Sequence, residues 1–154
     1  MNEFLSFVGK IRDVPEDTLH ERIASALATF SLEDKRDALV GTLSKGMKQK
    51  VALIAANLHQ PSVLVLDEPL TALDPRTQVF VNSWIGSQRE KGTTVLLSTH
   101  NLEIAQEHAT QIAIIDKGNI LAVGSLDLLR QKAGSGTDAR LDEVFLRLTE
   151  DNSR

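Results

Sequence analysis

Two adjacent carboxylates at the end of an apolar run are the residues of this chain best placed to do chemistry. The segment VLVLDEP, residues 63–69, runs from valine and leucine directly into Asp67 and Glu68. Neighbouring carboxylates repel each other, so they need solvent, an ion-pair partner or a bound cation. The segment is therefore either a strand that ends in two solvated acids, or a metal–nucleotide site at the carboxyl end of a buried strand.

Each of these acids has a distinct chemical use in the second interpretation. An aspartate at a strand end can hold Mg²⁺ directly or through water, and an adjacent glutamate can orient and deprotonate a water molecule. A second apolar run, TTVLLS, leads to His100. If the two runs form neighbouring parallel strands, His100 emerges beside Asp67, at the sheet edge where α/β proteins bind ligands. A lone histidine is more often a surface residue, and three others are expected to be structural: His20, His59 and His108.

Two further segments combine a structural role with a possible functional one. In LSKGM, residues 43–47, Ser44 is a good helix N-cap, and the helix start offers unpaired N–H groups to a phosphate. Gly46 allows close approach of the backbone and Lys45 adds positive charge. In TALDP, Asp74 precedes Pro75 and is expected to cap the following helix. Either segment taken alone is explained by capping.

Hydrophobic spacing predicts the helices that surround these residues. Residues 2–11 and 15–30 are predicted to be helical, the second because Leu19, Ile23 and Leu27 recur every fourth residue. A helix is expected to follow Ser44, with Val51, Ile54, Ala55 and Leu58 on one face and Pro61 near its end. Further helices are predicted after Asp74 (with Val79, Phe80 and Trp84), over 101–109, after Ser125 and from Asp138.

Two strands without polar alternation, residues 63–66 and 93–98, are predicted to be buried on both faces. A helix lies between them in sequence, as in a right-handed parallel crossover. Residues 111–116 and 120–124 flank the turn KGN and predict a hairpin. The fold class is therefore α/β.

Composition limits the classes of partner. The chain has 154 residues, a formal net charge of −4 and no cysteine, which argues against a nucleic-acid or anionic-membrane surface and excludes disulfides and thiolate metal sites. Its amino terminus lacks a basic segment followed by an apolar one, and its apolar runs are too short to span a bilayer. We expect a cytosolic protein that reaches a membrane only through a partner.

Four segments occur in a specific order: LSKGM, VLVLDEP, TALDP and LLSTH. They resemble the signature, Walker B, D-loop and switch-histidine motifs of ABC-type ATPases, and the resemblance covers almost the whole chain. Lys45 and Met47 replace the commoner Gly and Gln of the signature, and LTALDP replaces the frequent TSGLDP. LSKGM and the closing EVFLRLTED look like the nucleotide-binding subunits of ABC-2-type exporters.

The resemblance implies a role for each candidate residue in ATP hydrolysis. Asp67 would enter the Mg²⁺ shell and Glu68 would be the general base. His100 would contact the γ-phosphate and help to hold the attacking water. Asp74 would communicate across a subunit interface.

The resemblance also implies partners and subdomains. The residues Ser44, Lys45 and Gly46 would embrace ATP held by a second nucleotide-binding subunit, and a transmembrane permease would anchor the protein to the cytoplasmic membrane; no nucleic acid is expected. Residues 1–60 would form the helical signature subdomain and 61–132 part of the α/β core. A linker and a final helix would occupy 133–154.

The phosphate-gripping motif of the family, GxxxxGK[ST], has no counterpart here. Residues 41–48, GTLSKGMK, have its glycine spacing, but Met47 occupies the lysine position and Lys48 the Ser/Thr position. The family's adenine-stacking aromatic residue and Q-loop glutamine would also lie upstream of Met1. The predicted fold is thus an ABC-type P-loop ATPase fold that lacks its Walker A half, with poor hydrolysis expected of residues 1–154 alone.

Several functions stay open at this point. The first is the energy subunit of an ABC transporter, represented by its carboxyl-terminal portion, which is either truncated or completed by another polypeptide. The second is a non-catalytic partner that presents its signature segment to another subunit's ATP. A gene fragment without a stable fold, a metal-dependent hydrolase unrelated to ATP, and the ABC-type ATPases of nucleic-acid repair and translation are further alternatives.

Overall fold

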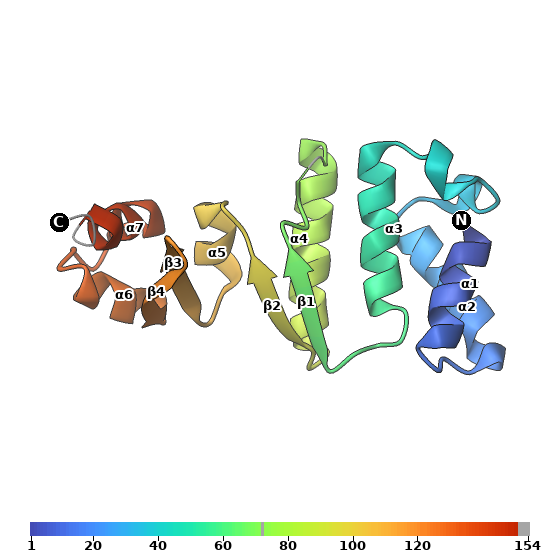
Figure 1. Cartoon of the computed structure of the whole chain (residues 1–154), viewed down its shortest axis with the longest axis horizontal. Helices are drawn as coiled ribbons and strands as arrows, with labels where there is room; N and C mark the ends of the chain where they lie inside the picture. The colour runs from blue at the N-terminus through green and yellow to red at the C-terminus, as the bar shows by residue number, and fades with distance from the viewer. Residues whose placement is uncertain (72, 151–154) are drawn as a thin grey trace. The chain divides into compact units, whose positions relative to one another are not determined.

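The computed structural model describes residues 1–71 and 73–150 and divides the chain into two compact units, Met1–Ser98 and Thr99–Arg154 (Figure 1). Ala72, within TALDP, and residues 151–154, which include the end of EVFLRLTED, lie outside the described residues. Each unit is described by itself below.

Three helices form the amino-terminal part of the first unit: α1 (Asn2–Ile11), α2 (Glu16–Thr29) and α3 (Lys45–Asn57). Short 3-10 helices, Glu33–Lys35 and Val40–Thr42, lie between α2 and α3. Both α1 and α2 pack against α3, and Leu5, Leu19, Ile23 and Leu27 are fully buried. The helices predicted over 2–11 and 15–30 are therefore confirmed.

The helix α3 begins and packs as its sequence predicts. The Ser44 hydroxyl accepts a hydrogen bond from the backbone N–H of Met47 at 3.2 Å, which satisfies one of the unpaired donors of the first turn. Val51, Ile54 and Leu58 are buried.

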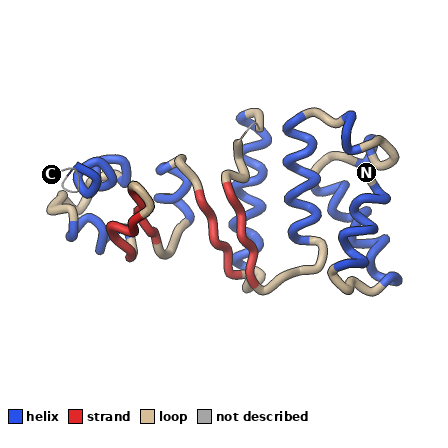
Figure 2. Tube along the Cα trace, viewed as in Figure 1, coloured by secondary structure: helices blue, strands red, loops and turns tan. Residues whose placement is uncertain are grey.

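The sheet of the first unit consists of β1 (Val63–Asp67) and β2 (Thr94–Ser98), paired in parallel (Figure 2). The helix α4 (Pro75–Glu90) connects them and packs against β2. Asp74 is its N-cap. The predicted pairing of the two apolar runs as parallel neighbours is confirmed.

The prediction that these strands are buried on both faces is wrong. Leu64 and Leu66 are buried, but Val63, Val65 and Leu96 are 55%, 66% and 62% exposed. The sequence lacks alternation because both faces are apolar, as in a sheet covered on two sides. In the described part of the chain, only one face of β1 is covered.

The helix α4 buries one of its faces. Val81, Trp84 and Ile85 are buried, whereas Val79 is 69% exposed. The Phe30 ring, at the end of α2, makes edge-to-face contacts with the rings of Phe80 and Trp84 at centroid distances of 5.3 and 5.4 Å. These contacts fasten the helical part of the first unit to the helix that supports its sheet.

The second unit contains α5 (Leu102–His108), an antiparallel hairpin of β3 (Ile112–Asp116) and β4 (Asn119–Gly124), α6 (Leu126–Lys132) and α7 (Leu141–Glu150). The predicted hairpin and the Ser125 cap of α6 are confirmed. The last helix begins at Leu141 and not at Asp138, because residues 136–139 form a turn closed by a hydrogen bond from the Ala139 N–H to the Gly136 carbonyl at 3.1 Å.

The compact units divide the chain at Ser98. The subdomains predicted from the family resemblance, with boundaries at residues 60 and 132, stay a prediction. Within the described residues, no helix combines the length and the apolarity needed to cross a membrane.

The buried stripe of α2 yields a stability prediction. Leu27 is 1% exposed, so Leu27→Ala should lower the free energy of unfolding by about 2–5 kcal/mol through lost contacts and a cavity. Leu39→Ala, at a 72% exposed leucine, should change it by less than about 0.5 kcal/mol. Urea unfolding followed by fluorescence of Trp84, the one tryptophan of the chain, reports on this unit. Equal losses in the two variants would contradict the packing.

Candidate functional site

The acidic end of β1 is built by the register of the sheet. Asp67 is the last residue of β1 and lies opposite Ser98, the last residue of β2. The Ser98 hydroxyl donates a hydrogen bond to the Asp67 carboxylate, and both side chains are exposed. Ser98 is a site residue that the sequence did not single out. Its position at the end of the second apolar run was the available signal, but only the register pairs it with Asp67.

Glu68 leaves the strand in an unusual backbone conformation. Its φ is +45°, in the left-handed region that few residues other than glycine adopt, and it precedes Pro69. Its N–H donates to the Ser98 carbonyl at 3.0 Å, and its carbonyl accepts from the Thr71 N–H at 3.1 Å. Such conformations cost free energy and are concentrated at functional sites.

Two glutamine side chains from the flanking helices hold the turn that follows Glu68. Gln49 of α3 donates from Nε2 to the Pro69 carbonyl at 3.1 Å, and Gln78 of α4 donates from Nε2 to the Leu70 carbonyl at 3.2 Å. Pro69 and Leu70 are themselves buried. The turn is therefore fixed from both sides, by contacts that sequence pattern alone does not reveal.

Asp74 performs the capping role that its sequence predicts. Its carboxylate accepts hydrogen bonds from the Thr77 N–H at 3.1 Å and from the Thr77 hydroxyl at 2.6 Å. The hydroxyl bond, and then the backbone bond, lower the pKa of Asp74 because both stabilise the charged form. A role for Asp74 across a subunit interface stays a prediction.

The LSKGM segment, residues 43–47, presents an accessible helix start. Ser44 and Lys45 are exposed and Gly46 is half-buried. The segment lies at the N-terminus of α3, where the helix dipole and free N–H groups favour an anion. The second turn of this helix carries Gln49, which ties α3 to the turn after Glu68. The segment and the acidic pair therefore belong to one connected part of the first unit.

His100 belongs to the second unit. It is exposed, follows the last residue of β2 by two positions, and precedes Asn101, the N-cap of α5. Its expected place beside Asp67 stays a prediction.

The residues at the acidic end of β1 fit a cation carried by a nucleotide. Among residues 1–71 and 73–150, no group of three or more His, Cys, Asp or Glu side chains could hold a metal ion by itself. Mg²⁺ in phosphate-transferring sites is bound by one or two carboxylates together with substrate phosphates and water. An exposed Asp67, which accepts a hydrogen bond from the Ser98 hydroxyl, would provide the protein share of that coordination.

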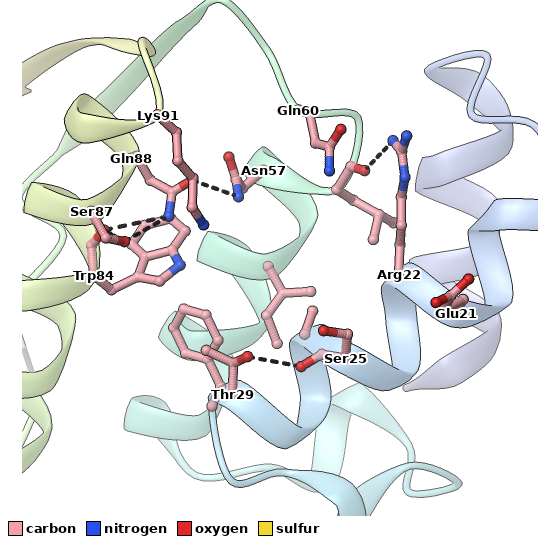
Figure 3. A pocket seen from close by; sticks show the side chains of 14 residues that line it. Glu21, Arg22, Ser25, Thr29, Asn57, Gln60, Trp84, Ser87, Gln88 and Lys91 are labelled. Carbon is pink, nitrogen blue, oxygen red and sulfur yellow. Dashed lines mark hydrogen bonds between the residues drawn. The ribbon is translucent and has the colours of Figure 1, made fainter.

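A groove with a volume of about 380 Å³ lies elsewhere in the first unit, between α2, the end of α3 and the end of α4 (Figure 3). None of the predicted site residues lines it. Its most buried polar side chain, Gln88, is already satisfied by bonds to the Trp84 carbonyl, the Ser87 hydroxyl and the Asn57 side-chain amide. The chemistry predicted from the sequence is therefore not located in this groove.

Comparison with known proteins places this geometry in a family. Residues 3–105 match a family profile described as "AAA domain, putative AbiEii toxin, Type IV TA system". A solved structure described as "Structure of ATP binding subunit of ABC transporter" superposes with a TM-score of 0.89 at 33% identity. It covers 96% of this chain, and this chain covers 61% of it. The chain belongs to the family of ABC transporter ATP-binding subunits.

Curated members of this ABC family are similar over nearly the whole chain. The ABC-type transporter ATP-binding protein EcsA of Bacillus subtilis is 31% identical over 98% of this chain and 61% of its own length. The daunorubicin/doxorubicin resistance ATP-binding protein DrrA of Streptomyces peucetius is 36% identical over 99% of this chain and 44% of its own. The methionine import ATP-binding protein MetN of Pasteurella multocida is 33% identical over 91% of this chain and 40% of its own length. The chain thus spans 40–61% of the length of these relatives.

The Thr77 bonds give a testable pKa. Asp74 should titrate below its ordinary value of 3.8, and Thr77→Val should move its pKa back upward because the hydroxyl donor is lost. A lowered folded pKa means that this carboxylate stabilises the fold fully above its unfolded pKa, and that the contribution is lost as pH falls through the folded value. Carboxyl NMR titration of both proteins measures the shift. The same pKa in the two would contradict this hydrogen bond.

Proposed function

We propose that this ABC family member is the ATP-hydrolysing part of a transporter's energy subunit, and that it works together with polypeptide that grips the nucleotide phosphates. The observation that carries the proposal is the acidic end of β1. Asp67 is bonded to Ser98 of the parallel neighbour, and Glu68 follows in a left-handed turn held by two helices. This end of a parallel sheet is where α/β proteins bind their ligands.

Each residue at this end would have one task. Asp67, with Ser98 beside it, would bind the Mg²⁺ that accompanies ATP, and when bound this ion would neutralise charge on the phosphates. Glu68 would orient a water molecule and accept its proton. His100, which follows β2, would contact the terminal phosphate. The Thr71 hydroxyl, 3.4 Å from Glu68 Oε2, would help to orient that carboxylate.

The grip on the phosphates would come from outside residues 1–154. The sequence has no GxxxxGK[ST], and its nearest imitation, residues 41–48, begins inside a 3-10 helix and ends inside α3. A phosphate-binding loop of that type instead joins a strand to a helix. We therefore expect residues 1–154 alone to hydrolyse ATP slowly.

The partners of the proposed subunit follow from the family. Ser44, Lys45 and Gly46 would contact the ATP that is bound by a second nucleotide-binding subunit. A permease would hold the complex at the cytoplasmic face of the membrane. LSKGM and EVFLRLTED favour an exporter, and the resistance protein DrrA is among the relatives. The import protein MetN matches as well, so export rests on these two segments.

Glu68 provides the sharpest test of catalysis. In a chimera that joins the part of EcsA outside the match to Met1 of this chain, Glu68→Gln should lower the ATP turnover rate on the order of a hundredfold or more, because a positioned base is lost while the side chain keeps its size. Phosphate release at saturating Mg–ATP measures it.

Glu90→Gln is the matched control for this test, since Glu90 is an exposed glutamate at the end of α4 in the same unit. It should turn over ATP at the unsubstituted rate. Turnover by Glu68→Gln equal to that of Glu90→Gln would remove Glu68 from the mechanism.

A second candidate function is favoured by the exposed start of α3. With Ser44 and Lys45 accessible, the chain could present its signature segment to ATP held by a complete subunit without hydrolysing ATP itself. Such a partner would bind that subunit only in the presence of nucleotide. No turnover by the chimera, together with ATP-dependent binding to complete EcsA, would favour this function over the first.

Ser44→Asp separates capping from nucleotide contact. Aspartate is as good an N-cap as serine, so α3 should persist, but its charge would face the phosphates and abolish ATP-dependent capture of complete EcsA. Ser125→Asp is the control, because Ser125 caps α6 through the Leu128 N–H in the same way. If Ser44→Asp is captured as well as Ser125→Asp, the segment does not contact ATP.

A further inference from the structure

Two glutamine side chains reach the turn after Glu68 from two different helices. Gln49 of α3 donates from Nε2 to the Pro69 carbonyl at 3.1 Å. Gln78 of α4 donates from Nε2 to the Leu70 carbonyl at 3.2 Å. Pro69 and Leu70 are buried, so a carbonyl that lost such a donor would have little water to replace it. Two consecutive carbonyls of the turn are therefore held by side chains from outside it.

The helices do not need these two bonds to stay in place. Their apolar faces are buried in the first unit through Val51, Leu53, Ile54, Val81, Trp84 and Ile85. At the far ends of the same two helices, the Asn57 side chain donates to Gln88 Oε1 at 3.2 Å (Figure 3). That bond joins helix to helix, whereas the Gln49 and Gln78 bonds join each helix to the turn. Loss of a turn bond is therefore expected to loosen the turn more than the helices.

The turn places the Glu68 carboxylate as well as its backbone. Glu68 has a φ of +45°, and such conformations persist when the surrounding structure holds them. The Thr71 N–H donates to the Glu68 carbonyl at 3.1 Å, and the Thr71 hydroxyl donates to Glu68 Oε2 at 3.4 Å. Pro69 and Leu70 lie between these two residues in the chain. A displacement of their carbonyls would therefore move the partner that orients the carboxylate.

On the basis of the function proposed above, we propose that Gln49 and Gln78 are positioning residues for Glu68. They hold the turn from α3 and α4, and the turn holds the carboxylate in the direction in which it meets the attacking water. In this role neither glutamine binds the nucleotide, and each acts through the turn. Their contribution is therefore to the rate of the chemical step and not to the affinity for ATP.

Hydrogen exchange in residues 1–154 tests the hold on the turn without nucleotide. Gln49→Met keeps the length and the helix preference of the side chain but removes its donor. The Glu68 N–H, bonded to the Ser98 carbonyl at 3.0 Å, should exchange roughly tenfold faster in this variant, because the turn opens locally more often. Amide exchange followed by NMR measures the rate, and circular dichroism checks that the variant is folded.

Turnover tests whether the hold serves catalysis. In the EcsA chimera described above, Gln49→Met should lower kcat roughly tenfold and leave KM within about twofold, since only the position of the base is changed. Gln78→Met should act in the same direction with a smaller effect, because the Leu73 N–H still donates to the Leu70 carbonyl at 3.4 Å. If Gln49→Met fails to fold, Gln78→Met decides both measurements.

Asn57→Leu is the matched control, because it removes an amide donor of α3 that bonds to α4 and not to the turn. It should leave Glu68 exchange, kcat and KM at the unsubstituted values, even where thermal unfolding shows the same loss of stability as in Gln49→Met. Faster exchange and lower kcat in Gln49→Met alone support the proposal. Equal effects in Gln49→Met and Asn57→Leu overturn it, because the glutamine then only stabilises the helices. An unchanged kcat in a chimera whose turnover needs Glu68 overturns it as well.

The two measurements separate this proposal from the proposed function. A chimera without turnover, or one whose turnover survives Glu68→Gln, contradicts the proposed function, and the exchange rates still decide whether the glutamines hold Glu68. Unchanged Glu68 exchange in both glutamine variants overturns the positioning role even when Glu68→Gln abolishes turnover.

Discussion

The parallel pairing of β1 with β2 is the constraint on which the candidate site depends. It joins two segments that lie far apart in the sequence so that Asp67 and Ser98 end their strands side by side, and it gives the Glu68 N–H its acceptor, the Ser98 carbonyl. A shift of one residue in this register would move Asp67 away from Ser98 and transfer the buried Leu64 and Leu66 to the exposed face. The register therefore determines both the burial of Leu64 and Leu66 and the position of Asp67.

The turn after β1 is held in place by hydrogen bonds from the helices on either side of it. Glu68 occupies a left-handed conformation that an isolated chain would rarely adopt. Gln49 and Gln78 hold the two following carbonyls from α3 and α4, and the Thr71 N–H bonds to the Glu68 carbonyl. Because α3 also begins at the LSKGM segment, the Gln49 bond ties that segment to the turn that carries the glutamate.

One face of this sheet is covered by α4, and the other face is exposed. The aromatic contacts of Phe30 with Phe80 and Trp84 consolidate the helical side, whereas Val63, Val65 and Leu96 remain exposed in a pattern that belongs to a doubly covered parallel sheet. Asp67 ends the exposed side of β1, and Glu68 follows it in the chain.

The sequence alone determined the elements and the family. Capping residues and apolar spacing are local signals, so α1, α2, α3 and the hairpin were predictable, and the ordered motifs indicated an ABC-type ATPase. Only the tertiary structure decided that Ser98 lies opposite Asp67, that Gln49 and Gln78 hold the acidic turn, and that Val65 is exposed although its strand looks fully buried. The reason is physical. An apolar side chain indicates that a surface can be buried, but the strand register and the neighbouring elements determine whether it is buried and which residues cover it.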